Sequence, residues 1–398
     1  MRSSAACSTT GTSDSPPFPY VLQGDPASVI KPGAVEFAPA FHNPEVHQGI
    51  ASIEERLPGH IEITASAMAS LGRLLPVSID SNLASASFQT ITYAVKDATG
   101  AGPIKAAEIT VPFYALWNSP AGTVGRPNPN YQQITQIMSR ANSTYAAGTV
   151  KISRSSHRGL SLNAHYTYAH AMDWNPNESS QVAGNDVLDP YDFGLEYGTS
   201  NLDMRHSAGV TVIYEAPWKM RGMAGRLGNS WMLSGVGHYR GGMPFTMRTS
   251  GSLAEEFLST INGTESIVAL GPGMNGSGGD NRVYGQGSDG HEYNIGRNTY
   301  RYPATWKADL RLSKRFDLGS MRQLELLAES FNLLNHQNVT EVETTGYTIE
   351  PGTEGELPTL NFLTGLKANT TAFGRPLNAN ATNFYRERQF QFGLRMRF

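Results

Sequence analysis

The sequence predicts an all-β fold, an antiparallel transmembrane β-barrel with long extracellular loops, and three observations lead to it. Apolar and polar residues alternate along many segments, short turn-like connections contrast with long polar ones, and every apolar run is too short for a membrane-spanning helix. We count about ten to twelve alternating segments, most of them long enough for a tilted strand to cross the hydrocarbon layer. Scarce charge and abundant glycine accompany this pattern: 16% of the 398 residues are charged and 41 are glycine.

Alternation first becomes clear in the segment Ser161–Ala171. Its two alternating sets are Leu162, Ala164, Tyr166 and Tyr168 on one side, and Ser161, Asn163, His165 and Thr167 on the other. Because successive side chains of a strand point to opposite faces, this segment predicts a strand with one apolar and one polar face. Weaker copies of the same period are Ile61–Leu71, Ile91–Val95, Val150–Ile152, Val210–Ala216 and Trp231–Tyr239.

The strongest alternation lies towards the C-terminus. Lys307–Phe316 and Arg322–Ser330 each alternate over most of their length, and the last ten residues, 389–398, separate most cleanly. In that last segment, five apolar side chains fall on one face: Phe390, Phe392, Leu394, Met396 and Phe398. The other face carries Gln389, Gln391, Gly393, Arg395 and Arg397.

The strands of a soluble antiparallel sandwich would also alternate, so the polar faces and the aromatic residues have to distinguish a sandwich from a membrane barrel. Full charges follow one another on one face at Lys307, Asp309 and Arg311, which suits a water-filled interior. Aromatic residues gather near strand ends, as interfacial girdles require, at Tyr166, Tyr168, Trp174, Trp218 and Phe331. The membrane barrel is therefore favoured. The alternative is a soluble or secreted β-sandwich for adhesion or carbohydrate binding, which the Gly/Asn/Thr-rich loops and exposed aromatics such as Tyr191 would serve.

Connections come in two sizes. Tight turns are predicted at Asp317–Ser320 and at Ala141–Ser143, whereas Asp173–Met204, Gly251–Arg301 and Asn338–Glu387 are long and polar. A compact soluble domain seldom tolerates several loops of this length, but an outer-membrane barrel has short turns at one rim and long loops at the other.

Composition excludes several classes of protein. The formal net charge of −3 gives no reason to expect a nucleic-acid partner. The single cysteine, Cys7, excludes an internal disulfide framework and multi-cysteine metal sites. Residues 1–20 are rich in Ser, Thr and Pro without an apolar core, so no signal peptide is predicted, and residues 1–15 are expected to be unstructured.

Several blocks of sequence resemble the barrel region of TonB-dependent transporters of the Oar-like kind. They are Leu57–His60 with Leu71–Arg73, Arg126–Tyr131, Gly159–Asp173, Asp203–His206, Gly241–Phe245, Gly296–Arg301, Glu329–His336 and the closing strand from Arg386 to Phe398. The resemblance implies a large outer-membrane barrel in contact with lipid, and import of a substrate driven by an energy-coupling complex. It also implies that the alternating residues Phe390, Phe392, Leu394, Met396 and Phe398 form the signal read by the outer-membrane barrel assembly machinery.

The chain also departs from that family. No signal peptide, energy-coupling box or plug is recognisable, and the family barrel has about twice as many strands as we count. Residues 16–398 are therefore expected to be the C-terminal part of such a barrel, a partial barrel whose energy coupling would need a plug supplied elsewhere. Two unpaired strand edges would follow, so the chain must close into a smaller barrel, pair with another chain or fail to insert. The substrate is not predictable.

No catalytic, cofactor-binding or metal site is predicted, and the chain is not expected to be an enzyme. Gly285–Gly290 matches a dinucleotide-binding pattern but lacks the flanking strand and helix, so we expect a mobile extracellular loop there. Asp173, Asp186, Asp189 and Asp192 are a weak candidate cation site, and alternation sends His165 and His170 to opposite faces. The basic residues Arg240, Arg311, Arg315, Arg395 and Arg397 would favour anionic solutes unless they pair with Asp309, Glu325 and Glu329; we favour pairing.

Overall fold

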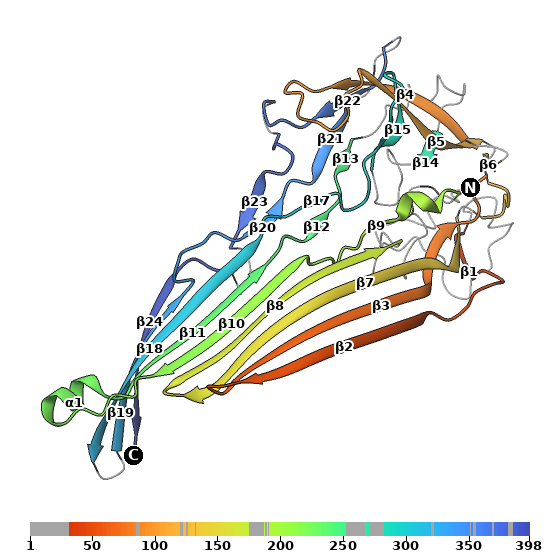
Figure 1. The fold of residues 1–398 in the computed structure, drawn as a ribbon. Helices are drawn as coiled ribbons and strands as arrows, with labels where there is room; N and C mark the ends of the chain where they lie inside the picture. The colour runs from red at the N-terminus through yellow and green to blue at the C-terminus, as the bar shows by residue number, and fades with distance from the viewer. Residues whose placement is uncertain are drawn as a thin grey trace, which may run out of the picture.

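The computed structural model describes residues 32–84, 88–119, 122–124, 126–131, 133–174, 187, 189, 191–251, 267–270, 282–319, 322–350, 352, 356–367, 370–380 and 385–398. Its described part is almost entirely β, with two large sheets at opposite ends of a long molecule (Figure 1). Helical structure comprises α1 (Gly222–Gly228) and the short 3-10 helix η4 (Phe193–Glu196). Among the described residues, no helix has both the length and the apolar character to span a bilayer.

The larger sheet has eleven strands, within the predicted range. Its main path runs through β2 (Glu45–Leu57), β3 (Ile61–Asp80), β7 (Ile134–His157), β8 (Leu160–Asp173), β10 (His206–Glu215), β11 (Trp231–Arg240), β18 (Thr305–Gly319), β19 (Arg322–Phe331) and β24 (Gln389–Arg397). All neighbours on this path are antiparallel; β1 (Ala34–Phe37) joins β7 in parallel and β9 (Gly198–Thr199) joins β8.

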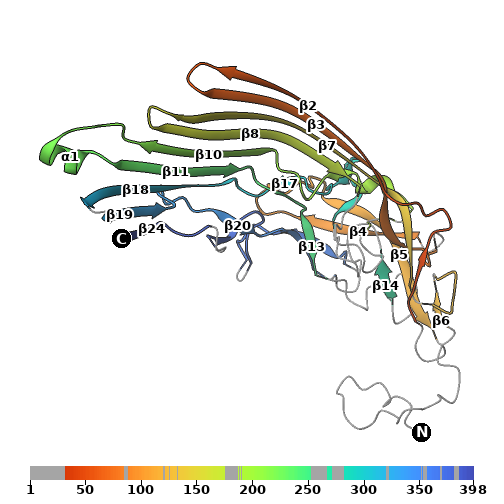
Figure 2. The same cartoon turned by 90° about the horizontal axis from the view of Figure 1, so that it is seen from below.

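This sheet is curved and open. Strands β2 and β24 lie at its two margins, and in the described part of the chain each pairs with one neighbour, β3 and β19 respectively (Figure 2). The partial barrel predicted from the sequence is therefore confirmed, together with its two free strand edges.

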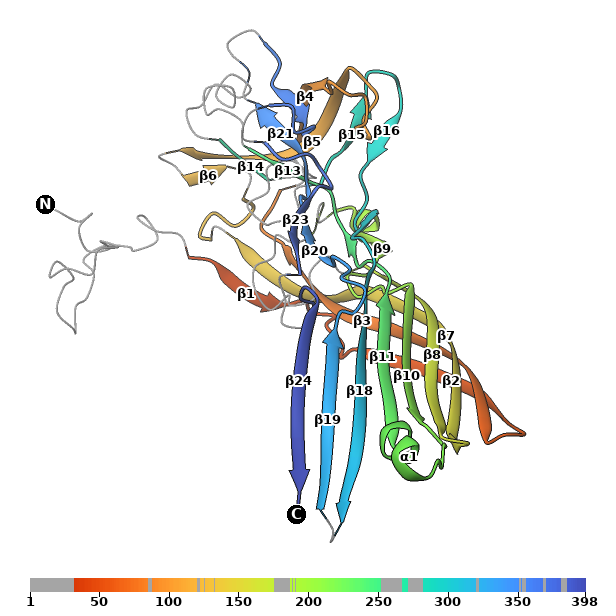
Figure 3. The ribbon, with the colours of Figure 1, turned by 90° about the vertical axis from the view of Figure 1, so that its left-hand side faces the viewer.

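The tight connections gather at one end of the sheet. The β2–β3 turn at Pro58–His60 and the β7–β8 turn at Arg158–Gly159 lie at the same end as the β18–β19 turn and the C-terminus (Figure 3). The long connections leave from the opposite end, as the barrel prediction requires. We call these the turn end and the loop end of the sheet.

The long connections fold into a second, nine-stranded sheet at the loop end. It contains β4 (Phe88–Lys96), β5 (Glu108–Ser119), β6 (Gly122–Val124), β13 (Arg248–Ser250), β14 (Ile267–Leu270), β15 (Tyr284–Gly287), β16 (Glu292–Asn294), β21 (Thr345–Glu350) and β22 (Thr359–Phe362). Two small ribbons, β12 (Pro244–Phe245) with β17 (Tyr300–Arg301) and β20 (Val339–Val342) with β23 (Pro376–Ala379), lie between the two large sheets (Figure 1).

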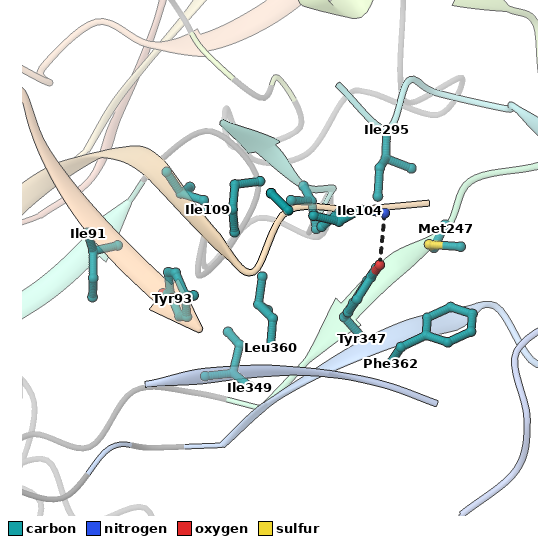
Figure 4. Close-up of a cluster of buried hydrophobic side chains, with 13 residues drawn as sticks. Ile91, Tyr93, Ile104, Ile109, Met247, Ile295, Tyr347, Ile349, Leu360 and Phe362 are labelled. Carbon is teal, nitrogen blue, oxygen red and sulfur yellow. Dashed lines mark hydrogen bonds between the residues drawn. The ribbon is translucent and has the colours of Figure 1, made fainter. Parts of the chain in front are cut away.

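The second sheet has a hydrophobic core of its own. Ile109, Val111, Tyr347 and Leu360 are all fully buried within a cluster of thirteen residues (Figure 4). The Tyr347 hydroxyl accepts a hydrogen bond from the Ile104 N–H at 3.2 Å, so its polar atom is satisfied inside this core. The long loops are thus a folded layer, which we call the outer layer.

Two strand predictions are wrong in detail. Ile91–Val95 lies in β4 of the outer layer and not in the barrel sheet, because half-buried strands have the same period in either sheet. Ala141–Ser143 is not a turn, since β7 runs unbroken from Ile134 to His157 and Ala141 is fully buried opposite Leu75. The irregularity lies instead on β3, where the pairing register shifts between Gly72 and Leu75.

Candidate functional site

The large sheet has two chemically different faces, which the strand register defines. One row across four strands joins Tyr166, Ala208, Tyr239 and Trp306, and the next row joins His165, Gly209, His238 and Lys307. Residues directly paired in antiparallel strands share a face, so the alternation of each strand adds to that of its neighbours. We call these the apolar face and the polar face.

The apolar face is exposed instead of packed. On β24, Phe390, Phe392, Leu394 and Met396 all lie on this face, opposite apolar or small residues of β19 (Ser330, Ala328, Leu326 and Leu324). Phe392 is 80% exposed, and Phe398, which follows the strand, is 85% exposed. A soluble sandwich would bury such a face against a second sheet, so the β-sandwich alternative does not fit.

Aromatic residues border the apolar face at both ends. Tyr168 and Trp306 lie towards the loop end, and Tyr214 and Trp231 towards the turn end. From His206, opposite Tyr168, to Tyr214 the strand β10 covers about 26 Å at ~3.3 Å per residue, comparable with the ~25 Å apolar band of outer-membrane barrels.

Two residues predicted for these girdles lie elsewhere. Trp174 packs in the outer layer against Phe193 and Tyr197, with ring centroids 5.8 and 5.5 Å apart. Phe331 pairs with Gln389, so it falls on the polar face. Trp174 follows the end of β8, where a sequence pattern no longer fixes the side-chain direction. Phe331, in contrast, is the last residue of β19 and alternates in step with Glu325 and Glu329, which places it on the polar face.

A basic pocket lies on the polar face near the turn end, between β11, β18, β19 and β24. Its volume is about 280 Å³, and its lining residues are Met232, Arg311, Arg315, Gln323, Glu325, Leu327, Arg395 and Arg397. The strand register places all of them on the polar face, including Leu327 and Met232, for which the sequence pattern had not assigned a face.

The predicted pairing of these arginines is confirmed in part. Arg311 binds Glu329 at 2.5 Å and Arg395 lies 3.8 Å from Glu325, both across neighbouring strands. Within the described residues, no ion pair reaches Arg315 or Arg397. The lining has four arginines and one glutamate; with Glu329, which pairs with Arg311 from outside the lining, an excess of two positive charges remains.

A set of buried ion pairs lies at the loop end of the large sheet. Asp80 pairs with Arg126, Asp173 with Arg297, Glu196 with Arg282, and Asp203 with Arg205 and Arg301. Arg297 joins strand β8 to the 3-10 helix η4 through the carboxylate and carbonyl of Asp173 and the carbonyl of Glu196. Paired charges of this kind hold a fixed geometry, because separating either partner leaves a buried charge.

Asp203 is the most heavily bonded of these acids. Its carboxylate accepts hydrogen bonds from the Ala171 N–H at 2.6 Å, from Arg205 Nε at 3.0 Å and from Arg301, and His170 Nδ1 lies 3.1 Å away. Burial alone would raise the pKa of Asp203, but these bonds outweigh burial and hold the pKa below its usual value. The carboxylate therefore remains charged at neutral pH.

Asparagines complete the connection between the two layers. Asn82 accepts a bond from the Asn128 N–H at 2.7 Å and donates to the carbonyls of Asn128 and Tyr131. Asn332 bridges His336 and Arg386 in the same way. Several of the blocks that carry the family resemblance thus supply polar groups to this junction, a role that strand periodicity could not indicate.

The motifs set aside in the sequence have structural roles. Gly285–Gly290 forms the β15–β16 hairpin and not a loose loop, and Gly290 supplies the positive φ of its turn.

The residues of the weak candidate cation site have other partners. Asp173 is paired with Arg297, while Asp189 and Asp192 accept hydrogen bonds from the N–H groups of Tyr191 and Gly194 in their own loop. Asp186 lies outside the described residues. His165 and His170 lie on opposite faces, as predicted. No group of three described metal-binding side chains is arranged around a common point.

The chain was compared with known proteins in three ways. A family model described as "outer membrane beta barrel domain" matches residues 2–391. No curated protein matches. Among solved structures the chain is similar to the outer membrane transporter YddB from Escherichia coli, with 8% sequence identity and a TM-score of 0.37 over 83% of this chain. The match covers 33% of that transporter, so this chain spans about a third of its length.

Proposed function

Because the chain belongs to the outer membrane beta barrel domain family, we propose that its large sheet forms part of the wall of a TonB-dependent, Oar-like outer-membrane transporter. The observation that carries this proposal is the two-faced open sheet, with exposed apolar side chains on one side and charged ones on the other. Lipid would contact the apolar face, and the polar face would line an aqueous interior.

The wall needs further strands to be complete. Backbone N–H and C=O groups along β2 and β24 would otherwise be unpaired in hydrocarbon, where each costs several kcal/mol. We propose that strands outside the described residues pair with both margins. Energy coupling would in turn need a plug supplied with them.

The polar face would be the route of the substrate. The excess of positive charge around Arg315 and Arg397 favours an anionic solute at the turn end, and the outer layer would form the entrance at the other end. The protein acts in this account by binding and passage, without catalysis.

The face of β24 is also the proposed assembly signal. Phe390, Phe392, Leu394, Met396 and Phe398 form one continuous exposed apolar row that ends at the last residue. An exposed margin strand of this kind can be recognised by strand addition, in which main-chain bonds give affinity and alternate side chains give specificity. The component expected to recognise this signal is the outer-membrane barrel assembly machinery.

Cell fractionation and heat-modifiable migration on a denaturing gel test the proposal. The chain is expected in the outer membrane and is expected to migrate faster unheated than boiled. Phe398→Ala should lower the inserted fraction, whereas Leu366→Ala, also strongly exposed but in the outer layer, should not. A soluble product that migrates identically with and without boiling would refute the proposed function.

A further inference from the structure

One connection at the turn end does not follow the rule of short turns. Residues 216–230 join β10 to β11 and include α1, whereas β2–β3 and β7–β8 are joined there by 58–60 and 158–159 (Figure 1). Tight hairpins would have sufficed for antiparallel neighbours. We call residues 216–230 the turn-end segment.

The turn-end segment lies against the apolar face. Lys314 shares that face with Leu312 and Phe316, and its ammonium group donates a hydrogen bond to the Asn229 carbonyl. The same ammonium lies 5.8 Å from the centre of the Trp231 ring and 4.8 Å from that of Phe316. A cation that would otherwise face lipid is therefore covered by the returning end of this segment.

Local hydrogen bonds hold the segment in one shape. Asn229 closes it by accepting from the Met220 N–H and donating to the Met220 carbonyl, both at 2.9 Å. The indole N–H of Trp231 donates to the Leu227 carbonyl at 2.7 Å. The segment is thus a built element at the margin of the apolar face.

Its apolar side chains have no cover in the described structure. Trp218 is 53% exposed, Leu227 62% and Met223 74%, and Met220 is also exposed. In water such a cluster would be unfavourable, but it continues the apolar face at the level where Trp231 marks the membrane boundary.

The charges of the segment have a single sign. It contains Lys219, Arg221 and Arg226 and no acidic residue. Within the described residues, none of the three forms an ion pair. Exposed apolar side chains with interspersed cations are the composition of segments that lie in the interface of an anionic membrane.

We propose that the turn-end segment is an interfacial anchor that binds the anionic phospholipids of the leaflet at the turn end. Trp218, Met223 and Leu227 enter the upper acyl region, and the three cations bind lipid phosphate groups. The inference rests on the proposed function, because the segment meets a leaflet only if the large sheet spans the bilayer.

A labelling experiment on the full chain tests the anchor. In a Cys7→Ser background, an environment-sensitive fluorophore is attached after Met223→Cys, Phe392→Cys or Leu366→Cys, and the protein is placed in phosphatidylcholine vesicles containing phosphatidylglycerol. Met223 and Leu366 are matched, since each is 74% exposed. Headgroup-level nitroxide lipids should quench the labels at positions 223 and 392 and leave the label at 366 unquenched.

Charge removal tests the lipid specificity. Each cation near an anionic surface is worth about fivefold in a partition equilibrium, so K219Q/R221Q/R226Q should shift the label at position 223 towards water by up to about a hundredfold. The shift should vanish in pure phosphatidylcholine. If position 392 is quenched and position 223 is not, the anchor is refuted and the transporter wall stands. If neither is quenched in vesicles, the labels are measured in isolated outer membranes, where complementary strands can pair with β2 and β24; absence of quenching at both positions there refutes both proposals.

Discussion

Among single residues, Asp203 is the one whose substitution we expect to destabilise the loop end most. Its buried carboxylate bonds to the Ala171 N–H of β8, to Arg301 of β17 and to Arg205, which directly precedes β10. Asp203→Asn removes the charge and leaves two arginines without their partner, which should destabilise the loop end by about 3 kcal/mol. Hydrogen exchange of residues 198–205 measures the loss. Asp317→Asn, at an exposed position near the turn end of β18, is the control and should change nothing.

The same carboxylate predicts a pH dependence. Because the pKa of Asp203 is lower in the folded protein than in the unfolded chain, its contribution to stability is complete above the unfolded value of about 3.9. The contribution is lost as the pH falls through the lower folded value. The difference in exchange protection between the wild-type protein and Asp203→Asn should therefore shrink in acid; a constant difference down to the lowest pH would contradict this assignment.

Two turn glycines offer a matched comparison. Gly59 and Gly159 have φ of 86° and 83°, but a Cβ at Gly159 would fall 2.0 Å from the Glu215 carbonyl oxygen, whereas one at Gly59 meets nothing within 4 Å. Gly59→Ala should cost about 1 kcal/mol for the backbone alone, and Gly159→Ala about 1–3 kcal/mol more. Urea titration of the heat-modifiable form measures both. Equal losses would show that the close contact is not rigid.

Side-chain partners were the part of the site that the sequence could not supply. Alternation placed Arg311, Arg395 and Glu329 on one face because the period of a strand is fixed by the backbone. Asp173 and Arg297, in contrast, are 124 positions apart in the sequence. They meet only because the outer layer folds back onto the loop end of the large sheet. No local pattern encodes such a contact.

Among the strands, β24 allows the apolar and polar faces to be compared at one depth in the membrane. Phe392→Arg puts a charge into the lipid-facing row and should cost about 2 kcal/mol or more, whereas its neighbour Gln391→Arg points to the polar face beside Glu329 and should be neutral. The inserted fraction in a heat-modifiability assay is the measurement. Equal effects of the two substitutions would mean that the apolar and polar faces of β24 contact the same solvent.

Strands were predictable where alternation was strong, and their partners where turns were short. Strands β8, β18, β19 and β24 lie where the sequence places them. The failures have a common cause: Ala141–Ser143 has turn-like residue types, but the backbone there bonds to β3 and β8, and tertiary pairing outweighs local preference. Likewise, nothing in the period of Ile91–Val95 distinguishes one sheet from the other.

For the assembled molecule, the free margins make a specific prediction. In detergent, alternate amides of β2 and β24 should exchange quickly, since those that point away from the sheet have no partner, while central β8 stays protected. In native outer membranes all amides of both margins should be protected, because complementary strands pair with them. Alternate exchange in the membrane would show that the sheet is not completed.

The open edges follow from the number of strands in the large sheet, which lies within the range predicted from the sequence. The outer layer was not predicted. Its strands are short and come from connections that read as polar loops, and its core joins Ile109 with Tyr347 and Leu360 from distant parts of the chain. Burial there depends on contacts between segments that are far apart in the chain, and the period of a single segment does not encode such contacts.

A lipid-accessibility scan along β8 would settle whether the large sheet is a membrane wall. Single cysteines from Leu160 to Tyr168, labelled in a bilayer that contains acyl-chain nitroxides, report which side chains contact lipid. Positions 162, 164 and 166 should be quenched and positions 161, 163, 165 and 167 should react with water-soluble reagents, a period of two. Uniform accessibility to water along the strand would contradict the account.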